Sequence, residues 1–221
     1  MNKLLSITLL STLTFSLTQG ETFMGDTELA NKTIDSIIVL GTAKLTNVKT
    51  ESLTVTGPLT FNKVDVSGNV AVVGTIEDDS MDLVCKDLDV LGTVSAKKIK
   101  CVNINLAGTA KLEDLEATGD VKIVGPTTIT KGNLQNAFIT ANEIHLKDVK
   151  VKDITIDKIP LLTQTQVLTL EGNTAISGTI TFKSEKGEII VKDKAQIGKI
   201  VGATAKDEKG NPINEKNPKN K

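Results

Sequence analysis

Two cysteines are the residues of this chain best suited to chemistry, and each begins a copy of the same short sequence motif. Cys85 opens CKDLDVLGT and Cys101 opens CVNINLAGT, 16 residues later. If the fold repeats at this spacing, the two cysteines lie on neighbouring strands, with Cα atoms inside the roughly 4.4–6.8 Å range of a disulfide. The Cβ atoms of in-register neighbours lie about 5 Å apart, which is wider than usual for a disulfide. The spacing therefore leaves both a disulfide and a reduced pair open.

The other candidates for chemistry are few. His145 is the single histidine, and it alternates with Ile144 and Leu146, so we expect it to be an ordinary surface residue. A metal site needs more ligands than two cysteines, and His145 lies over forty residues from them. The acidic segment EDDSMD at residues 77–82 is expected to bulge as a loop, without the apolar cleft that tunes carboxyl groups for catalysis. We expect no catalytic residue, no cofactor and no metal ion.

Regularly spaced glycines indicate the elements that position these residues. Six glycines are separated by 16, 17, 18, 16 and 17 residues: Gly41, Gly57, Gly74, Gly92, Gly108 and Gly125. The side chain four positions before each glycine is aliphatic in Ile37, Leu53, Val70, Leu88, Ile104 and Val121. Two positions before each glycine stand Val39, Val55, Val72, Val90, Leu106 and Ile123. Alternation of this kind that continues through a glycine predicts an extended chain that turns a corner at the glycine.

A repeat of this length predicts an all-β fold, a single-stranded parallel β-helix (β-solenoid) with 16–18-residue coils. Stacked coils pair every strand in parallel and join the aliphatic columns into one core, which a single coil could not stabilise alone. The solenoid is predicted over residues 37–204, with about nine or ten coils. Residues 21–36 are expected to form an N-terminal arm or cap, and residues 205–221 a disordered polar tail.

One polar column accompanies the aliphatic ones. Five positions before each glycine stand Ser36, Ser52, Asn69, Asp87, Asn103 and Asp120. Such side chains at a turn are expected to bond to the backbone and to one another as a polar ladder. Calcium is the alternative, but the glycine-rich nonapeptide of calcium-binding repeats is absent.

Residues 1–20, MNKLLSITLLSTLTFSLTQG, are typical of a secretory signal peptide. We therefore expect the mature chain to be exported to a periplasm, a cell surface or the extracellular space, without a transmembrane segment. Its composition disfavours nucleic acid as a partner: 2% of residues are aromatic, the net charge is −1 and no arginine occurs.

In its coil length and aliphatic columns the chain resembles the bactofilins, bacterial polymer-forming scaffold proteins. The resemblance implies a right-handed β-helix that polymerises, although bactofilins are cytoplasmic and this chain begins like an exported one. The pattern is also similar to the repeats of secreted bacterial adhesins. Left-handed hexapeptide-repeat acyltransferases are an enzyme alternative, but they keep a six-residue phase that spacings of 16 and 17 break.

These observations predict an exported, non-catalytic structural protein of an envelope or extracellular layer. Self-association by end-to-end stacking is expected, because a parallel solenoid has unpaired backbone groups at both ends. The alternative is a secreted adhesin-like or host- or ligand-binding factor. The sequence does not identify a partner.

Overall fold

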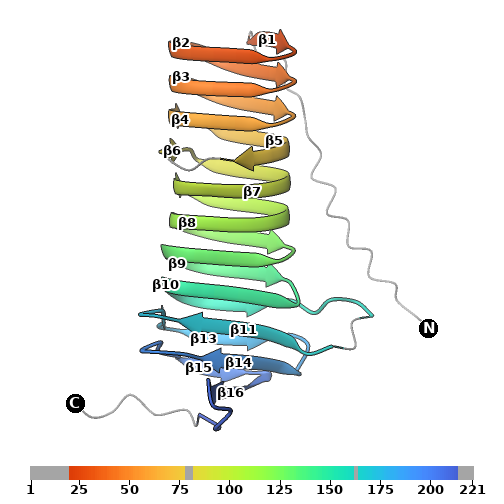
Figure 1. The fold of residues 1–221 in the computed structure, drawn as a ribbon, viewed down its shortest axis with the longest axis vertical. Helices are drawn as coiled ribbons and strands as arrows, with labels where there is room; N and C mark the ends of the chain where they lie inside the picture. The colour runs from red at the N-terminus through yellow and green to blue at the C-terminus, as the bar shows by residue number, and fades with distance from the viewer. Residues whose placement is uncertain (1–19, 78–81, 162–163, 214–221) are drawn as a thin grey trace.

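The computed structural model describes residues 20–77, 82–161 and 164–213, and these residues form one upright stack of coils (Figure 1). All strand pairings between named strands are parallel, in one sheet that winds around the stack. The strands are β1 (Glu21–Met24), β2 (Thr27–Leu40), β3 (Ala43–Thr56), β4 (Leu59–Val66), β5 (Asn69–Glu77), β6 (Leu83–Val84), β7 (Asp87–Cys101), β8 (Asn103–Val124), β9 (Thr127–Thr140), β10 (Glu143–Ile156), β11 (Gln166–Glu171), β12 (Ala175–Ile176), β13 (Thr179–Phe182), β14 (Gly187–Val191), β15 (Lys199–Val201) and β16 (Ala203–Asp207).

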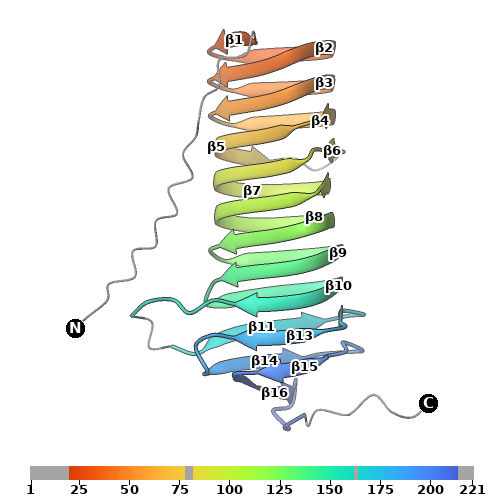
Figure 2. The ribbon, with the colours of Figure 1, turned by 180° about the vertical axis from the view of Figure 1, so that it is seen from behind.

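The fold is the predicted all-β parallel solenoid, with about 11 turns at a mean spacing of roughly 17 residues. This is slightly more than the nine or ten expected coils, because the stack begins before residue 37. Seen from behind, the same stack runs from β1 at one end to β16 at the other (Figure 2). Among the described residues, none belongs to a helix of the length and apolarity that crossing a bilayer requires.

Each regular coil has three sides, as residues 87–102 show. The first side alternates inward Leu88 and Val90 with outward neighbours, and Gly92 forms the corner that follows. The second side buries Val94 and Ala96, and the short third side buries its first and last residues. The period of two predicted from the sequence therefore sets which side chains enter the core.

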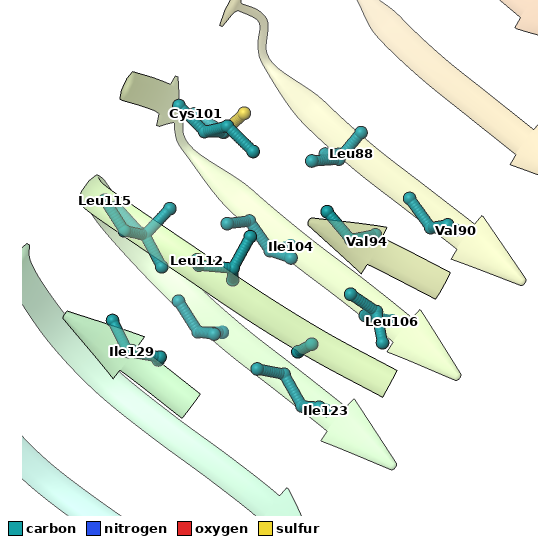
Figure 3. Close-up of a cluster of buried hydrophobic side chains, with 14 of the residues drawn as sticks. Leu88, Val90, Val94, Cys101, Ile104, Leu106, Leu112, Leu115, Ile123 and Ile129 are labelled. Atoms are coloured by element: carbon teal, nitrogen blue, oxygen red, sulfur yellow. The ribbon is translucent and has the colours of Figure 1, made fainter. Parts of the chain in front are cut away.

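The core is a set of aliphatic columns that run the length of the rod. All twelve side chains two and four positions before the six glycines are buried, with exposed fractions of 4% or less. In Figure 3 Leu88, Val90, Ile104 and Leu106 project from successive strands into the same interior, together with Val94 from another side of a coil. Burial of one such side chain contributes roughly 1.5–3 kcal/mol, so the columns are the main stabilising element.

The corner glycines have a second reason to be glycine. Their φ angles lie between 133° and 148°, a conformation that other residues rarely adopt. A Cβ atom on Gly92 would overlap the carbonyl oxygen of Gly74 in the preceding coil. Glycine is therefore required by close contact between coils, and not only by the turn.

A second corner, which was not predicted from the sequence, follows six residues after Gly25 and after five of the six corner glycines; the position six residues after Gly74 lies outside the described residues. The residue there is left-handed, with φ between 51° and 58° at Asn31, Asn47, Lys63, Lys98, Asp114 and Lys131. Asn and Asp tolerate this conformation better than other non-glycine residues. Three of these six positions are Asn or Asp, which is a signal that the sequence did carry.

Both ends of the solenoid extend beyond the predicted limits. Residues 21–36, for which an arm or cap was expected, lie in β1 and the first part of β2, and they pair in register with the next coil. Residues 205–213 of the predicted tail complete β16 and a turn after it. The signal peptide predicted at residues 1–20 lies outside the described residues except for Gly20, and so do residues 214–221.

The coils become longer near the C-terminus. Leu146 of β10 pairs with Leu170 of β11, and Ile154 pairs with Ile180 of β13, so 24 and 26 residues separate these partners. The segment between β10 and β11 and a turn after β11 account for the added length. The inward columns continue across this change, since Leu170 and Ile180 are fully buried.

Candidate functional site

Cys85 and Cys101 are joined by a disulfide, with their Cα atoms 4.9 Å apart. Cys85 precedes β7 and Cys101 ends it, so the bond links one coil to the next. Both residues are buried, with exposed fractions of 6% and 5%. The disulfide lies in the core, where it packs and cross-links.

The neighbours of the disulfide differ from the sequence-based assignment. The two cysteines stand seven residues before Gly92 and Gly108, and the same count from Gly74 and Gly125 gives Ser67 and Thr118. The register instead continues the column through Val66 and Ala117, which are buried. The 17-residue coils carry their extra residue after this column, as the register shift between Ala117 and Asp120 shows, so the count from the following glycine is off by one.

His145 lies on an outward face of β10, as predicted, and it belongs to a charged cluster. Its Nε2 lies 3.2 Å from Oε2 of Glu171, and Nζ of Lys147 lies 2.6 Å from Oε1 of the same carboxylate. Lys147 is the direct register partner of Glu171 across β10 and β11. The cluster therefore connects two coils at the point where the coil length changes.

Lys147 and Glu171 form an ion pair within this cluster, and each stabilises the charged form of the other. The hydrogen bond from Lys147 lowers the pKa of Glu171, and the same hydrogen bond raises the pKa of Lys147. Both groups thus stay charged near neutral pH, whereas a general acid or base works best with a pKa near the operating pH. We interpret the cluster as an interaction that stabilises the packing of one coil on the next.

A cavity of about 500 Å³ lies beside His145. Its walls are formed by Pro126, Thr127, Thr128, Glu143, Ile144, His145, Val167 and Thr169. No hydrogen bond within the described part of the chain joins His145 to the hydroxyl groups of Thr128 or Thr169, its register neighbours. Within the same residues no three histidine, cysteine or acidic side chains converge as metal ligands.

The predicted polar ladder is present. Ser36 and Ser52 share a hydrogen bond of 2.7 Å between their Oγ atoms, and the Asn103 amide donates to Asp87 Oδ1 at 2.8 Å. Asn103 Oδ1 in turn accepts a hydrogen bond from the backbone N–H of Asp120. Each of these bonds connects one coil to the next, which is a stabilising role.

The N-terminal rung, defined as residues 20–36, has one side without a strand partner in the described chain. β1 pairs with β2 alone, and residues 27–36 pair with β3 alone. Phe23 and Ile34 lie in inward columns at this rung but are only partly buried. The rung therefore offers backbone donors and acceptors beside an apolar interior, which is the usual template for strand addition.

The C-terminal rung, defined as residues 192–206, is partly covered by the chain itself. Residues 207–213 turn back beneath β16, and we call this segment the fold-back. The N–H of Ile213 donates to the carbonyl of Ala205 at 2.9 Å, and the N–H of Asp207 donates to that of Asn211 at 2.9 Å. Lys206 and Pro212 form an antiparallel bridge between these two bonds.

An apolar ridge follows the outer side of the glycine corner. The residues directly before the corner glycines include exposed Met24, Leu40, Val73, Leu91 and Val124. Leu91 is 59% exposed and Met24 is 80% exposed. The remaining positions of the column are uncharged, so this ridge is a second candidate surface.

The chain matches no family model, no curated protein and no solved structure in the three comparisons that were made.

Proposed function

We propose that the mature chain is an exported, non-catalytic rod that self-associates through its open N-terminal rung, as a structural component of a cell envelope or extracellular layer. The observation that carries this proposal is the rung itself, where, within the described residues, β1 and the start of β2 have a strand partner on one side only and lie at the end of an apolar core. Natural proteins usually blunt such an edge, so an open one favours strand pairing with another chain.

Two further observations support the proposal. The disulfide between Cys85 and Cys101 is consistent with export, because disulfides persist in oxidising compartments. The chain also has no Trp, Tyr or Arg, the residues that most often form compact binding hot spots.

Sedimentation velocity and negative-stain imaging of the mature chain test the proposal. We expect association that rises with concentration and yields particles longer than one rod. Phe23→Lys places a charge in an inward column of the open rung and should weaken association. Met24→Lys is the matched control, because it adds the same charge to a neighbouring outward position. A wild-type chain that stays monomeric at high concentration contradicts the proposal.

The apolar ridge favours a second candidate, the adhesin-like or ligand-binding factor. Leu40 and Leu91 present apolar side chains outward, and both are exposed. Co-sedimentation of the mature chain with intact envelopes measures this activity. Loss of binding in a Leu40→Ser/Leu91→Ser variant would support the adhesin-like function, whereas the rod proposal predicts no effect of these substitutions.

A further inference from the structure

We propose that the C-terminal rung is the docking surface for the N-terminal rung of a second copy, and that the fold-back of residues 207–213 competes for this surface. The inference rests on the proposed function, since it names the partner and the regulation of the same open edge. It concerns the two ends of the rod that Figures 1 and 2 place farthest apart.

The two rungs carry opposite charge. The N-terminal rung holds four acidic side chains and one lysine, Glu21, Asp26, Glu28, Asp35 and Lys32, for a net side-chain charge of −3. The C-terminal rung holds four lysines and one aspartate, Lys192, Lys194, Lys199, Lys206 and Asp193, for a net charge of +3. Glu28 and Lys206 form ion pairs within the chain, with Lys44 and Glu188, and Asp193 accepts a hydrogen bond from the N–H of Gly172. The other seven side chains are exposed or partly exposed. Head-to-tail contact pairs unlike charges, whereas contact between two N-terminal rungs repeats the negative charge.

Two inward columns of the two rungs also match in size when the register is extended by one coil. The column that contains Phe23 and Val39 reaches Phe182, the register partner of Ile156. The carbonyl oxygen of Phe182 lies against Gly202, which follows the paired residues Thr181 and Val201. A second copy in the same register would place its Phe23 beneath Gly202, which has no side chain. The column of Thr27 and Ala43 likewise ends at Ala205, so two small residues would meet there.

The fold-back occupies one of the three sides on which such a copy would pair. A continuing coil would add residues 27–30 in parallel beneath β16, because β16 ends the column series that begins with these residues. Residues 211–213 already pair there in the antiparallel sense. Ala205 is only 7% exposed although it lies in the last strand, and Ile213 packs against the core.

Asp207 holds the fold-back in place. Its Oδ1 accepts hydrogen bonds from the backbone N–H groups of Lys209 and Asn211, and its Oδ2 accepts one from the Asn211 side chain at 2.8 Å. Release of this turn frees the lower edge of β16. A chain whose fold-back is closed cannot bind a second copy at β16. The apparent affinity for a second copy is therefore the affinity of the open chain multiplied by the fraction of chains that are open.

Full-length variants of the mature chain test the competition by sedimentation velocity. Asp207→Ala removes the acceptor and should lower the concentration of half-association about tenfold. Glu208→Ala is the matched control, because it removes the same charge from the same turn, and should behave like wild type. A disulfide in the Lys206→Cys/Pro212→Cys variant would hold the fold-back closed. These two residues lie directly opposite each other without hydrogen bonds between their backbones, and such pairs have the shortest Cα–Cα distance in an antiparallel ladder. The locked chain should stay monomeric until it is reduced.

Charge exchange tests the polarity of the contact. Glu21→Lys/Asp26→Lys should weaken association, and adding Lys194→Glu/Lys199→Glu to the same chain should restore it. A different result would overturn the head-to-tail inference. If association returns when the Glu21→Lys/Asp26→Lys variant is mixed with wild type, but not when Lys194→Glu/Lys199→Glu is added, the contact is between two N-terminal rungs. Equal association of the locked and Asp207→Ala chains would overturn the competition and leave the proposed function standing. Absence of association in every variant would overturn both.

Discussion

The carbonyl oxygen of Gly74 occupies the place where a Cβ atom on Gly92 would have to lie. The same relationship joins each corner glycine to the one before it, from Gly41 to Gly125. The corner is thus a column of backbone in close contact, and its geometry repeats because each glycine needs the one beneath it.

Gly92→Ala should therefore lower stability more than an ordinary glycine substitution. The φ of 143° strains the alanine backbone, and the added methyl group must displace the preceding coil. We expect a loss of about 3 kcal/mol or more, measured by chemical denaturation. Gly210→Ala is the control, since its φ is 85° but nothing lies within 4 Å of the new Cβ; a loss as large at Gly210 would show that strain alone is responsible.

Val90→Asp places a carboxylate in an inward column between Val72 and Leu106. Val90 is 4% exposed, so the charge would lack water and should cost several kcal/mol, about enough to unfold the adjacent coils. The neighbouring Leu91→Asp points outward and should change stability by no more than about 0.5 kcal/mol. Thermal melts of the two variants decide the assignment, and similar melting temperatures would contradict it.

The disulfide predicts a mature chain two daltons lighter than the reduced form in non-reducing mass spectrometry. Replacing both Cys85 and Cys101 with alanine should lower the free energy of unfolding by about 3 kcal/mol, the value typical of a closed loop of this size. Detection of free thiols in the native, non-reduced protein would refute the bond.

Asp207 should titrate below its ordinary value of 3.8, because the Asn211 side chain and backbone hydrogen bonds lower its pKa. A depressed folded-state pKa means that the turn gains stability above the unfolded value and loses it as the pH falls through the lowered pKa. The NMR shifts of the Asn211 amide groups should follow this titration with a midpoint below 3.8. A midpoint at or above 3.8 would indicate that the turn does not hold the carboxylate.

The columns of the core were predictable because each depends on a local rule. Val39, Val55 and Val72 stand at a fixed distance before a glycine, and strand alternation alone then directs them inward. The polar ladder at Ser36 and Ser52 followed from the same count.

Residues added at corners were harder to locate, because they leave the alternation on either side unchanged. Leu83 pairs with Val64 and Ile99, which stand seven residues after their glycines, whereas the residue seven after Gly74 is Met81, outside the described residues. For the same reason the sequence did not predict the contact of His145 with Glu171, 26 positions apart and across the longest coil.

The ends were missed for a different reason. Gly25 stands 16 residues before Gly41, yet Glu21 and Thr27 replace the aliphatic residues expected around it. An end rung has one neighbour instead of two, so polar residues cost less there. Pairing with β3 then decides the structure where the hydrophobic pattern is weak.

The direction of the backbone hydrogen bonds has a mechanical consequence. They run along the rod from coil to coil, so a force that pulls the two ends apart would separate the coils one at a time. The disulfide between Cys85 and Cys101 crosses one of these boundaries with a covalent bond. Under tension this bond would keep two central coils together after the flanking coils have separated.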